Sequence, residues 1–231
     1  MMRYDTQKRT KSVMYVNKYD KHGECSKNGN HAEHSFVEIL KYKNCFDRKA
    51  TQQEQFDHID YFAKKNGYGI SFDVKARKKK ARNDSDVDDD LVWVEFKNGS
   101  GDKGWLYGKA TCIAFERERD FVIVERSLLL NFCKNKVENK KVSSSKDAIY
   151  KLYTRNGRND LLSIVKMEDV MREIRFFIWQ KNHPQVMQNL RVEHETGSRT
   201  QKRTCKKVSF FAPHGKRILQ IIPMLESIGQ I

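Results

Sequence analysis

The sequence predicts an α/β fold in which a mixed central β-sheet is flanked by helices. Segments with a period of two, such as residues 70–76, alternate along the chain with segments of helical period, such as residues 31–42. A chain of 231 residues is long enough to bury a sizeable core in one globular domain. We therefore expect a central domain over residues 31–181. A basic segment (1–30) precedes it, and a basic extension (182–231) that is dispensable for chemistry follows it.

Several segments have the apolar pattern of helices. In the first, residues 31–42, the side chains of Phe36, Val37, Ile39 and Leu40 form one apolar stripe. The other predicted helices are residues 126–134, 170–180 and 218–228.

Two consecutive strands are predicted over residues 58–62 and 70–76, with an Asn-Gly turn signal between them. Side chains alternate along a strand, so Asp73 and Lys75 share one face of the second strand. The opposite face is apolar, and we expect it to lie on the core. Asp60 lies on the first strand, so the hairpin brings two acids and an ammonium group to one open surface.

The remaining strands are predicted from runs of β-branched and aromatic residues. They are residues 91–97, 121–124, 150–155 and 161–165. The last two form a hairpin around Asn156-Gly157, a strong turn signal. The glycine-rich residues 98–108 lead into a short helix.

The two acids of the first hairpin point to a cation. Ionised Asp60 and Asp73 side by side repel each other unless a cation lies between them. A hard cation that prefers oxygen ligands, such as Mg²⁺ or Mn²⁺, fits this pair. Lys75 can then orient a water or stabilise an anion nearby. Metal-dependent hydrolysis of a phosphodiester needs these groups.

Asp60, a hairpin-length gap and Asp73-Val74-Lys75 resemble the PD-(D/E)xK nuclease superfamily, in particular its resolvase-like and phage-type members. The resemblance covers roughly residues 30–125, and it departs from the pattern at Ile59, where Pro is expected. It implies a restriction-endonuclease-like core and a Mg²⁺ or Mn²⁺ ion held by Asp60 and Asp73. It also implies that Lys75 positions the attacking water.

The resemblance further implies a third acid on the helix before the first strand. Resolvase-like members have a Glu there, followed by apolar residues three, six and seven positions later. Glu33, followed by Phe36, Ile39 and Leu40, has this spacing, whereas Glu38 does not. Glu33 is therefore the predicted additional ligand, directly or through water.

A second triplet, Glu95-Phe96-Lys97, competes for the role of Asp73 and Lys75. Its Glu and Lys also leave their strand on the face opposite the core. We favour Asp73 and Lys75, because a short loop brings Asp60 next to them. Glu95 is then a neighbour that supports the site or adds a ligand, and Lys97 is a secondary candidate.

Composition favours a polyanionic partner. The chain has 45 Lys and Arg against 30 Asp and Glu, a formal charge of +15. Such a charge attracts nucleic acid through its phosphates without base specificity. The predicted contacts are Arg77, Lys78, Lys79, Lys80, Arg82 and Trp105. For Trp105, stacking on an unpaired base competes with anchoring its loop to the core, and we favour anchoring. The acidic residues 84–90 are expected to form an exposed loop.

Cysteine usage and hydropathy argue against two classes of protein. The five cysteines are scattered, unlike the framework of a secreted disulfide scaffold. No apolar stretch reaches membrane-spanning length, and the N-terminus lacks a signal-peptide core. We expect an intracellular protein, in the cytoplasm or in the host cell if it is viral. We expect it to bind DNA and not a membrane. Whether it forms a homodimer is left open.

The sequence thus predicts a Mg²⁺-dependent endodeoxyribonuclease whose nuclease domain is residues 31–181. Two alternatives stay open, namely a nucleic-acid-binding module without activity and a ribonuclease on the same scaffold. The substrate is not specified, because the superfamily spans restriction, repair, recombination and RNA cleavage.

Overall fold

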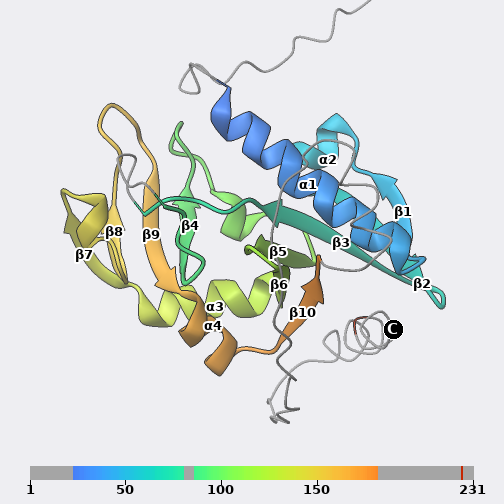
Figure 1. Ribbon diagram of the computed structural model, residues 1–231. Helices are drawn as coiled ribbons and strands as arrows, with labels where there is room; N and C mark the ends of the chain where they lie inside the picture. The colour runs from blue at the N-terminus through green and yellow to red at the C-terminus, as the bar shows by residue number, and fades with distance from the viewer. Residues whose placement is uncertain (1–22, 81–85, 182–224, 226–231) are drawn as a thin grey trace, which may run out of the picture.

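The computed structural model describes residues 23–80, 86–181 and Leu225 (Figure 1). The elements in these ranges are α1 (Glu24–Tyr42), β1 (Phe46–Lys49), α2 (Gln52–Phe56), β2 (Tyr61–Lys65), β3 (Tyr68–Lys75), β4 (Leu91–Lys97), η1 (Trp105–Tyr107), β5 (Cys112–Glu116), β6 (Asp120–Glu125), α3 (Arg126–Lys136), β7 (Glu138–Val142), η2 (Ser145–Asp147), β8 (Lys151–Tyr153), β9 (Leu161–Lys166), α4 (Met167–Glu173) and β10 (Phe176–Gln180). Predictions made for residues 1–22, for Arg82 and, apart from Leu225, for the extension fall outside the described ranges.

The mixed α/β class is confirmed, but the described strands form two sheets rather than one central sheet. The first sheet has the order β1-β2-β3-β5-β6-β10, and the second has the order β4-β9-β8-β7. Each sheet is mixed, because β3 pairs with β5 and β7 pairs with β8 in parallel, among antiparallel neighbours. The strand predicted at β4 is present, but its sequence pattern does not reveal that β4 pairs with β9 in the second sheet.

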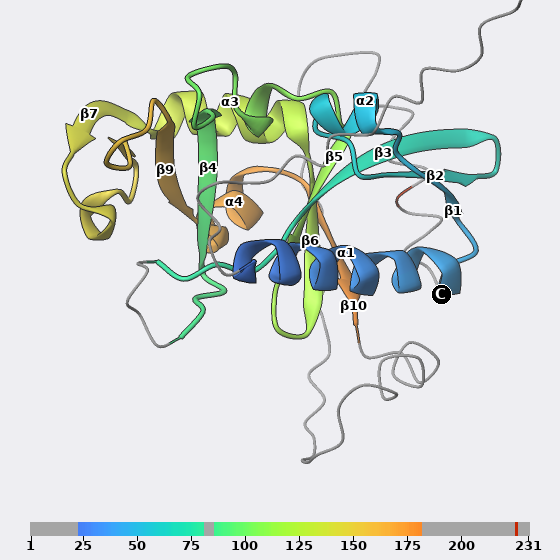
Figure 2. The ribbon, with the colours of Figure 1, turned by 90° about the horizontal axis from the view of Figure 1, so that it is seen from above.

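Helix α1 covers one face of the first sheet, and α3 lies on the opposite side (Figure 2). Helix α1 begins at Glu24 rather than at residue 31. The prediction missed its first turns because they are polar and carry no apolar stripe. The predicted stripe is buried. At its centre the Phe36 ring lies 5.0 Å from the Phe72 ring, 5.1 Å from Phe121 and 5.6 Å from Trp179, measured between centroids.

The β2–β3 hairpin is confirmed, with a shift at its start. Asn66 and Gly67 both have positive φ (52° and 81°), which suits a two-residue turn, and Lys65 pairs with Tyr68 across it. The first strand begins at Tyr61 rather than at residue 58. Helix α2 was not predicted, and its last turn continues to His58, whose φ is 59°.

The second core lies between the two sheets and beneath α3 and α4. Val92 and Val94 of β4 contribute to it, together with Val165 of β9 and Leu129 of α3. The predicted hairpin of β8 and β9 is present. Both faces of the first sheet are therefore covered, one by α1 and the other by this second core.

The helix predicted over residues 170–180 is wrong in its second half. Helix α4 ends at Glu173, and residues 176–180 form β10, which pairs with β6 along its full length. This run is aromatic and β-branched, a composition that fits strands as well as buried helices. Residues 176–180 form a strand rather than a helix because the free edge of β6 offers backbone hydrogen bonds to them. In this strand, Trp179 stacks on the ring of Phe36.

Leu225 comes from the predicted extension but belongs to the first core, where it is 2% exposed. The extension therefore supplies a side chain to this core, and its predicted dispensability for chemistry stays a prediction. In the described part of the chain, no helix has both the length and the apolar character needed to cross a bilayer.

Replacing Leu225 with Ala should lower the free energy of unfolding by about 2–5 kcal/mol, because it removes a fully buried side chain and leaves a cavity. Urea denaturation of the full chain measures this. Phe56→Ala is the control, since Phe56 is 64% exposed and should change stability by no more than about 0.5 kcal/mol. Equal stability of Leu225→Ala and wild type would show that the extension does not contribute to the core.

Candidate functional site

The acid and the lysine of β3 lie together, but in a buried setting. The Lys75 Nζ is 2.6 Å from the Asp73 Oδ1, and the lysine side chain is 21% exposed. Asp73 itself is only 2% exposed, because its neighbour on β5 is Ile113 of the second core. The predicted alternation of β3 is correct, but the face that carries Asp73 is covered rather than open.

Asp60 lies immediately before β2 and is fixed by the backbone. Its N–H donates to the Phe72 carbonyl (2.8 Å), and its own carbonyl accepts from the Ala50 N–H (2.8 Å). Its Oδ2 accepts a hydrogen bond from the Val74 N–H at 2.7 Å. The Asp60 carboxylate thus takes the Val74 N–H that would donate to a β2 carbonyl if the strand pairing continued. This hydrogen bond holds the carboxylate beside Asp73.

The Asp73 carboxyl has an unmet requirement for a positive partner. Burial and, to a lesser extent, the nearby Asp60 charge raise the pKa of Asp73 to about 7, because the Lys75 charge offsets them only in part. The Asp73 Oδ2 is buried and accepts no hydrogen bond. The carboxyls of Asp60 and Asp73 are within hydrogen-bonding reach, a contact that is favourable only with a proton or a cation between them.

Glu33 faces this pair from α1. Its Oε2 accepts from the Tyr61 hydroxyl at 3.0 Å and lies 3.9 Å from the Lys49 Nζ. Burial and the Asp60 charge raise the pKa of Glu33. No three acidic, His or Cys side chains of the described residues gather closely enough to hold a metal ion directly. The close pair is Asp60 and Asp73, and a water-mediated role is the one left for Glu33.

Glu95 reaches the site from the second sheet. Burial raises its pKa, and Lys75 and Lys78 are the nearest cations that oppose the shift. Gly104 allows the glycine-rich loop to pack closely on Glu95, because a Cβ at position 104 would lie 2.3 Å from the Glu95 carbonyl oxygen. Lys97 is exposed and is separated from Glu95 by a bulge in β4. Glu95, rather than Lys97, is therefore the residue of this triplet that lies near Lys75.

Trp105 is not an open stacking surface. It is 6% exposed, packs on Phe115 with ring centroids 6.0 Å apart, and has the Lys75 Nζ 5.0 Å from its ring centroid. The anchoring interpretation agrees with this burial, and a nucleic-acid contact does not. Trp105 instead supports the side chain of Lys75.

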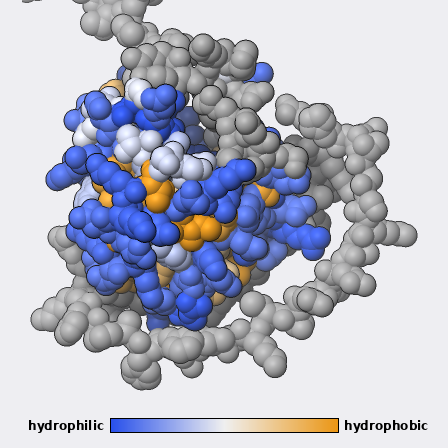
Figure 3. Space-filling view, turned by 90° about the vertical axis from the view of Figure 1, so that its left-hand side faces the viewer, coloured by the Kyte–Doolittle hydropathy of each residue, from blue (hydrophilic) through white to orange (hydrophobic). Residues whose placement is uncertain are grey.

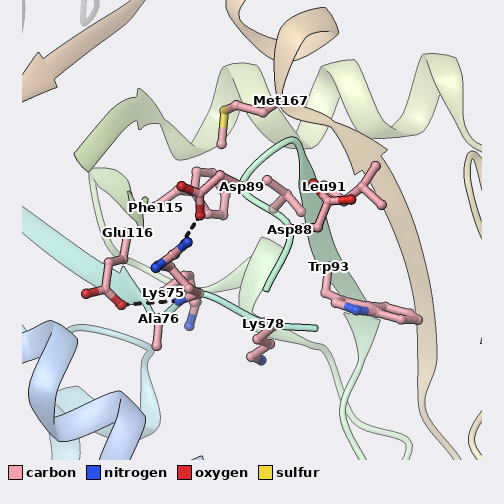
Figure 4. Close-up of a pocket in the computed structure, with 12 residues that line it drawn as sticks. Lys75, Ala76, Lys78, Asp88, Asp89, Leu91, Trp93, Phe115, Glu116 and Met167 are labelled. Atoms are coloured by element: carbon pink, nitrogen blue, oxygen red, sulfur yellow. Dashed lines mark hydrogen bonds and ion pairs between the residues drawn. The ribbon is translucent and has the colours of Figure 1, made fainter. Parts of the chain in front are cut away.

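The basic run after β3 is partly neutralised. Arg77 Nε lies 2.6 Å from Asp89 Oδ1, so the acidic stretch folds back on the basic one (Figure 4). Lys78 and Lys79 are exposed and Lys80 is partly exposed. The cavity between Lys75 and Asp89 measures about 30 Å³, room for a water but not for a nucleotide. A nucleic acid must therefore bind on the surface around it.

His58 is a residue of the site that the sequence analysis missed. Its ring lies near Lys75 and Asp60, and burial followed by the Lys75 charge lowers the pKa of His58. A positive φ at a residue with a side chain is uncommon and occurs often at functional sites. Its position two residues before Asp60 could have indicated this role. The prediction of a strand over residues 58–62 gave His58 no separate role.

Neither the protein-family models, nor the curated proteins, nor the solved structures compared with this chain gave a match.

The buried carboxyl makes a prediction about stability and pH. The folded-state pKa of Asp73 lies above its usual value, so its contribution to stability is full at low pH and is lost as the pH rises towards 7. In EDTA, the free energy of unfolding of Asp73→Asn should increase relative to that of wild type as the pH rises from 5 to 8. The gain is at most about 1.4 kcal/mol for each pH unit below 7. Urea denaturation at several pH values measures it.

Glu54→Gln is the control for this measurement. The Glu54 carboxylate accepts from Arg48 and from the Thr51 N–H, and these bonds lower its pKa to about 2. Its contribution changes below pH 5, so its difference from wild type should be constant between pH 5 and 8. A constant difference for Asp73→Asn as well would contradict the raised pKa.

Proposed function

We propose that this protein is a metal-dependent endonuclease that hydrolyses phosphodiester bonds in DNA. The observation that carries the proposal is the buried, unsatisfied Asp73 carboxyl beside Asp60, with Lys75 bonded to it. Such a pair is costly in a fold unless a cation binds there. The order of the acids and the lysine along the chain agrees with the PD-(D/E)xK resemblance and with a restriction-endonuclease-like core.

The donor set fits Mg²⁺ or Mn²⁺, since both prefer carboxylate oxygens. Asp60 and Asp73 would hold the ion, and Glu33 would contribute through a water. When bound, such an ion polarises the phosphoryl group and favours ionisation of a water. Lys75, held by Asp73 and Trp105, would orient the attacking water and offset the negative charge that develops on the phosphate.

A non-catalytic nucleic-acid-binding module is the second candidate, and one observation favours it. Lys78 and Lys79 are exposed, while Asp73 is buried and Asp60 is only partly exposed. A ribonuclease differs from the main proposal only in substrate. Incubation with plasmid, single-stranded DNA, branched DNA and RNA, in Mg²⁺ and in EDTA, distinguishes the three.

Asp73→Asn and Lys75→Ala should each lower the cleavage rate by about 10²- to 10⁴-fold, because each removes a group that acts on the reacting phosphate. A fluorescent oligonucleotide cleavage assay measures the rate. Asp102→Asn and Lys103→Ala, two exposed residues of the glycine-rich loop, are matched controls and should keep wild-type rates. Normal rates for the β3 variants would transfer the role to Glu95 and Lys97.

Binding should depend steeply on salt, because the attraction rests on charge. Replacing Lys78, Lys79 and Lys80 together with Ala should weaken binding to every duplex alike. It should also reduce the slope of log K against log salt by up to about 3, or roughly 0.9 for each phosphate contact. Fluorescence anisotropy in EDTA measures both. Unchanged affinity and slope would mean that these lysines serve solubility alone.

A further inference from the structure

The second sheet carries an aromatic pair on the face that looks away from the second core. Trp93 of β4 and Tyr153 of β8 have ring centroids 6.0 Å apart, and both side chains are partly exposed. Trp93 lines the small cavity together with Phe115 and Met167, but its ring extends away from these two side chains (Figure 4). The pair is separate from the acids of the candidate site.

The strand position of Glu95 and one hydrogen bond connect this pair to the candidate site and to the basic run. Glu95 lies two residues after Trp93 on the same strand, and Lys75, Lys78 and Arg155 are the cations nearest to it. The Trp93 Nε1 donates to the Lys79 carbonyl at 3.1 Å, which places the exposed Lys78 and Lys79 next to the indole. A continuous surface therefore runs from Lys75 to Trp93 and Tyr153.

The surface combines cations with accessible ring area. Lys151 lies on the same face of β8 as Tyr153, because two residues separate them. The side of the molecule on which β7, β8 and β9 lie is largely hydrophilic (Figure 3). Duplex DNA presents phosphates but keeps its bases stacked inside, so rings on a protein surface add little to duplex binding. An unpaired base can stack on such rings.

We propose that Trp93 and Tyr153 form a stacking platform for unpaired bases, so that the substrate presents a single-stranded segment at the candidate site. This inference rests on the proposed function for the class of ligand, a nucleic acid. The lysines bind the phosphates, the aromatic pair takes a base, and the neighbouring phosphate is directed towards Lys75. Substrates with single-stranded arms or gaps are favoured over continuous duplex.

The three tryptophans of the chain provide a direct readout. All three lie in the described ranges, and Trp105 and Trp179 are 6% and 1% exposed, so Trp93 is the one that a ligand can reach. Oligothymidylate, oligouridylate and a duplex of equal length are titrated into wild-type protein in EDTA, and the tryptophan emission is recorded. The single strands should quench the emission, and the duplex should not. Trp93→Phe should abolish the quenching.

Affinity tests the same surface independently. Trp93→Leu and Tyr153→Leu should each weaken single-strand binding by about 5- to 150-fold and leave duplex binding unchanged. Phe56→Leu is the matched control, since it removes an exposed ring far from the second sheet in sequence and fold. Binding without quenching, or equal affinities for all variants, would overturn the proposal.

A measurement on the unsubstituted protein covers the case in which a variant fails to fold. Acrylamide quenching of tryptophan emission should decrease when oligothymidylate binds, and unchanged quenching would overturn the platform. The comparison with cleavage separates the two proposals. Protected Trp93 without cleavage retains the platform and removes the nuclease, whereas cleavage with unprotected Trp93 does the reverse. The ratio of oligodeoxyuridylate to oligouridylate affinity, two oligomers that differ only in the 2′-hydroxyl, identifies the preferred sugar.

Discussion

The rest of the structure depends on the packing of Phe36 against three rings. Phe72, Phe121 and Trp179 come from β3, β6 and β10, so one side chain of α1 contacts strands from the middle of the first sheet to its β10 edge. Aromatic contacts of this kind stabilise a core beyond the area that they bury. Glu33 lies one helical turn before Phe36, and Asp73 follows Phe72 on the opposite face of β3. The packing that holds α1 in place therefore also determines where the acids lie.

That same burial creates the electrostatic requirement of the site. Strand β3 is covered on both faces, and the second core beside Asp73 removes water that would otherwise solvate its charge. Lys75 pairs with one oxygen of Asp73 and leaves the other without a partner. The Asp60 carboxylate is held close by the Val74 N–H, so it adds repulsion rather than relief. A proton satisfies this pair at low pH, and a cation can do so at neutral pH.

Local patterns predicted much of the fold because β3, β4 and α3 take their structure from their own periodicity. The partners of strands were not predictable, since a strand pattern does not say which edge it meets. Residues 176–180 and the second sheet are the two examples. In the site, alternation placed Asp73 and Lys75 on one face, but it could not show that the second core covers that face. Trp93 and Trp105 look alike in sequence, and only packing makes one buried and the other accessible.

Local ion pairs, rather than net charge, determine which lysines meet a polyanion. The basic run and the acidic stretch are neighbours in sequence, and the Arg77–Asp89 pair shows that they partly neutralise each other in space. Asp89 also accepts from the Glu118 N–H, so the acid is fixed to the first sheet and keeps Arg77 there. The chain beyond Arg77 is held differently, because the Lys79 carbonyl accepts from Trp93 on the second sheet. The charge of +15 sets the long-range attraction. These two anchors direct the remaining exposed lysines towards the aromatic side of the molecule.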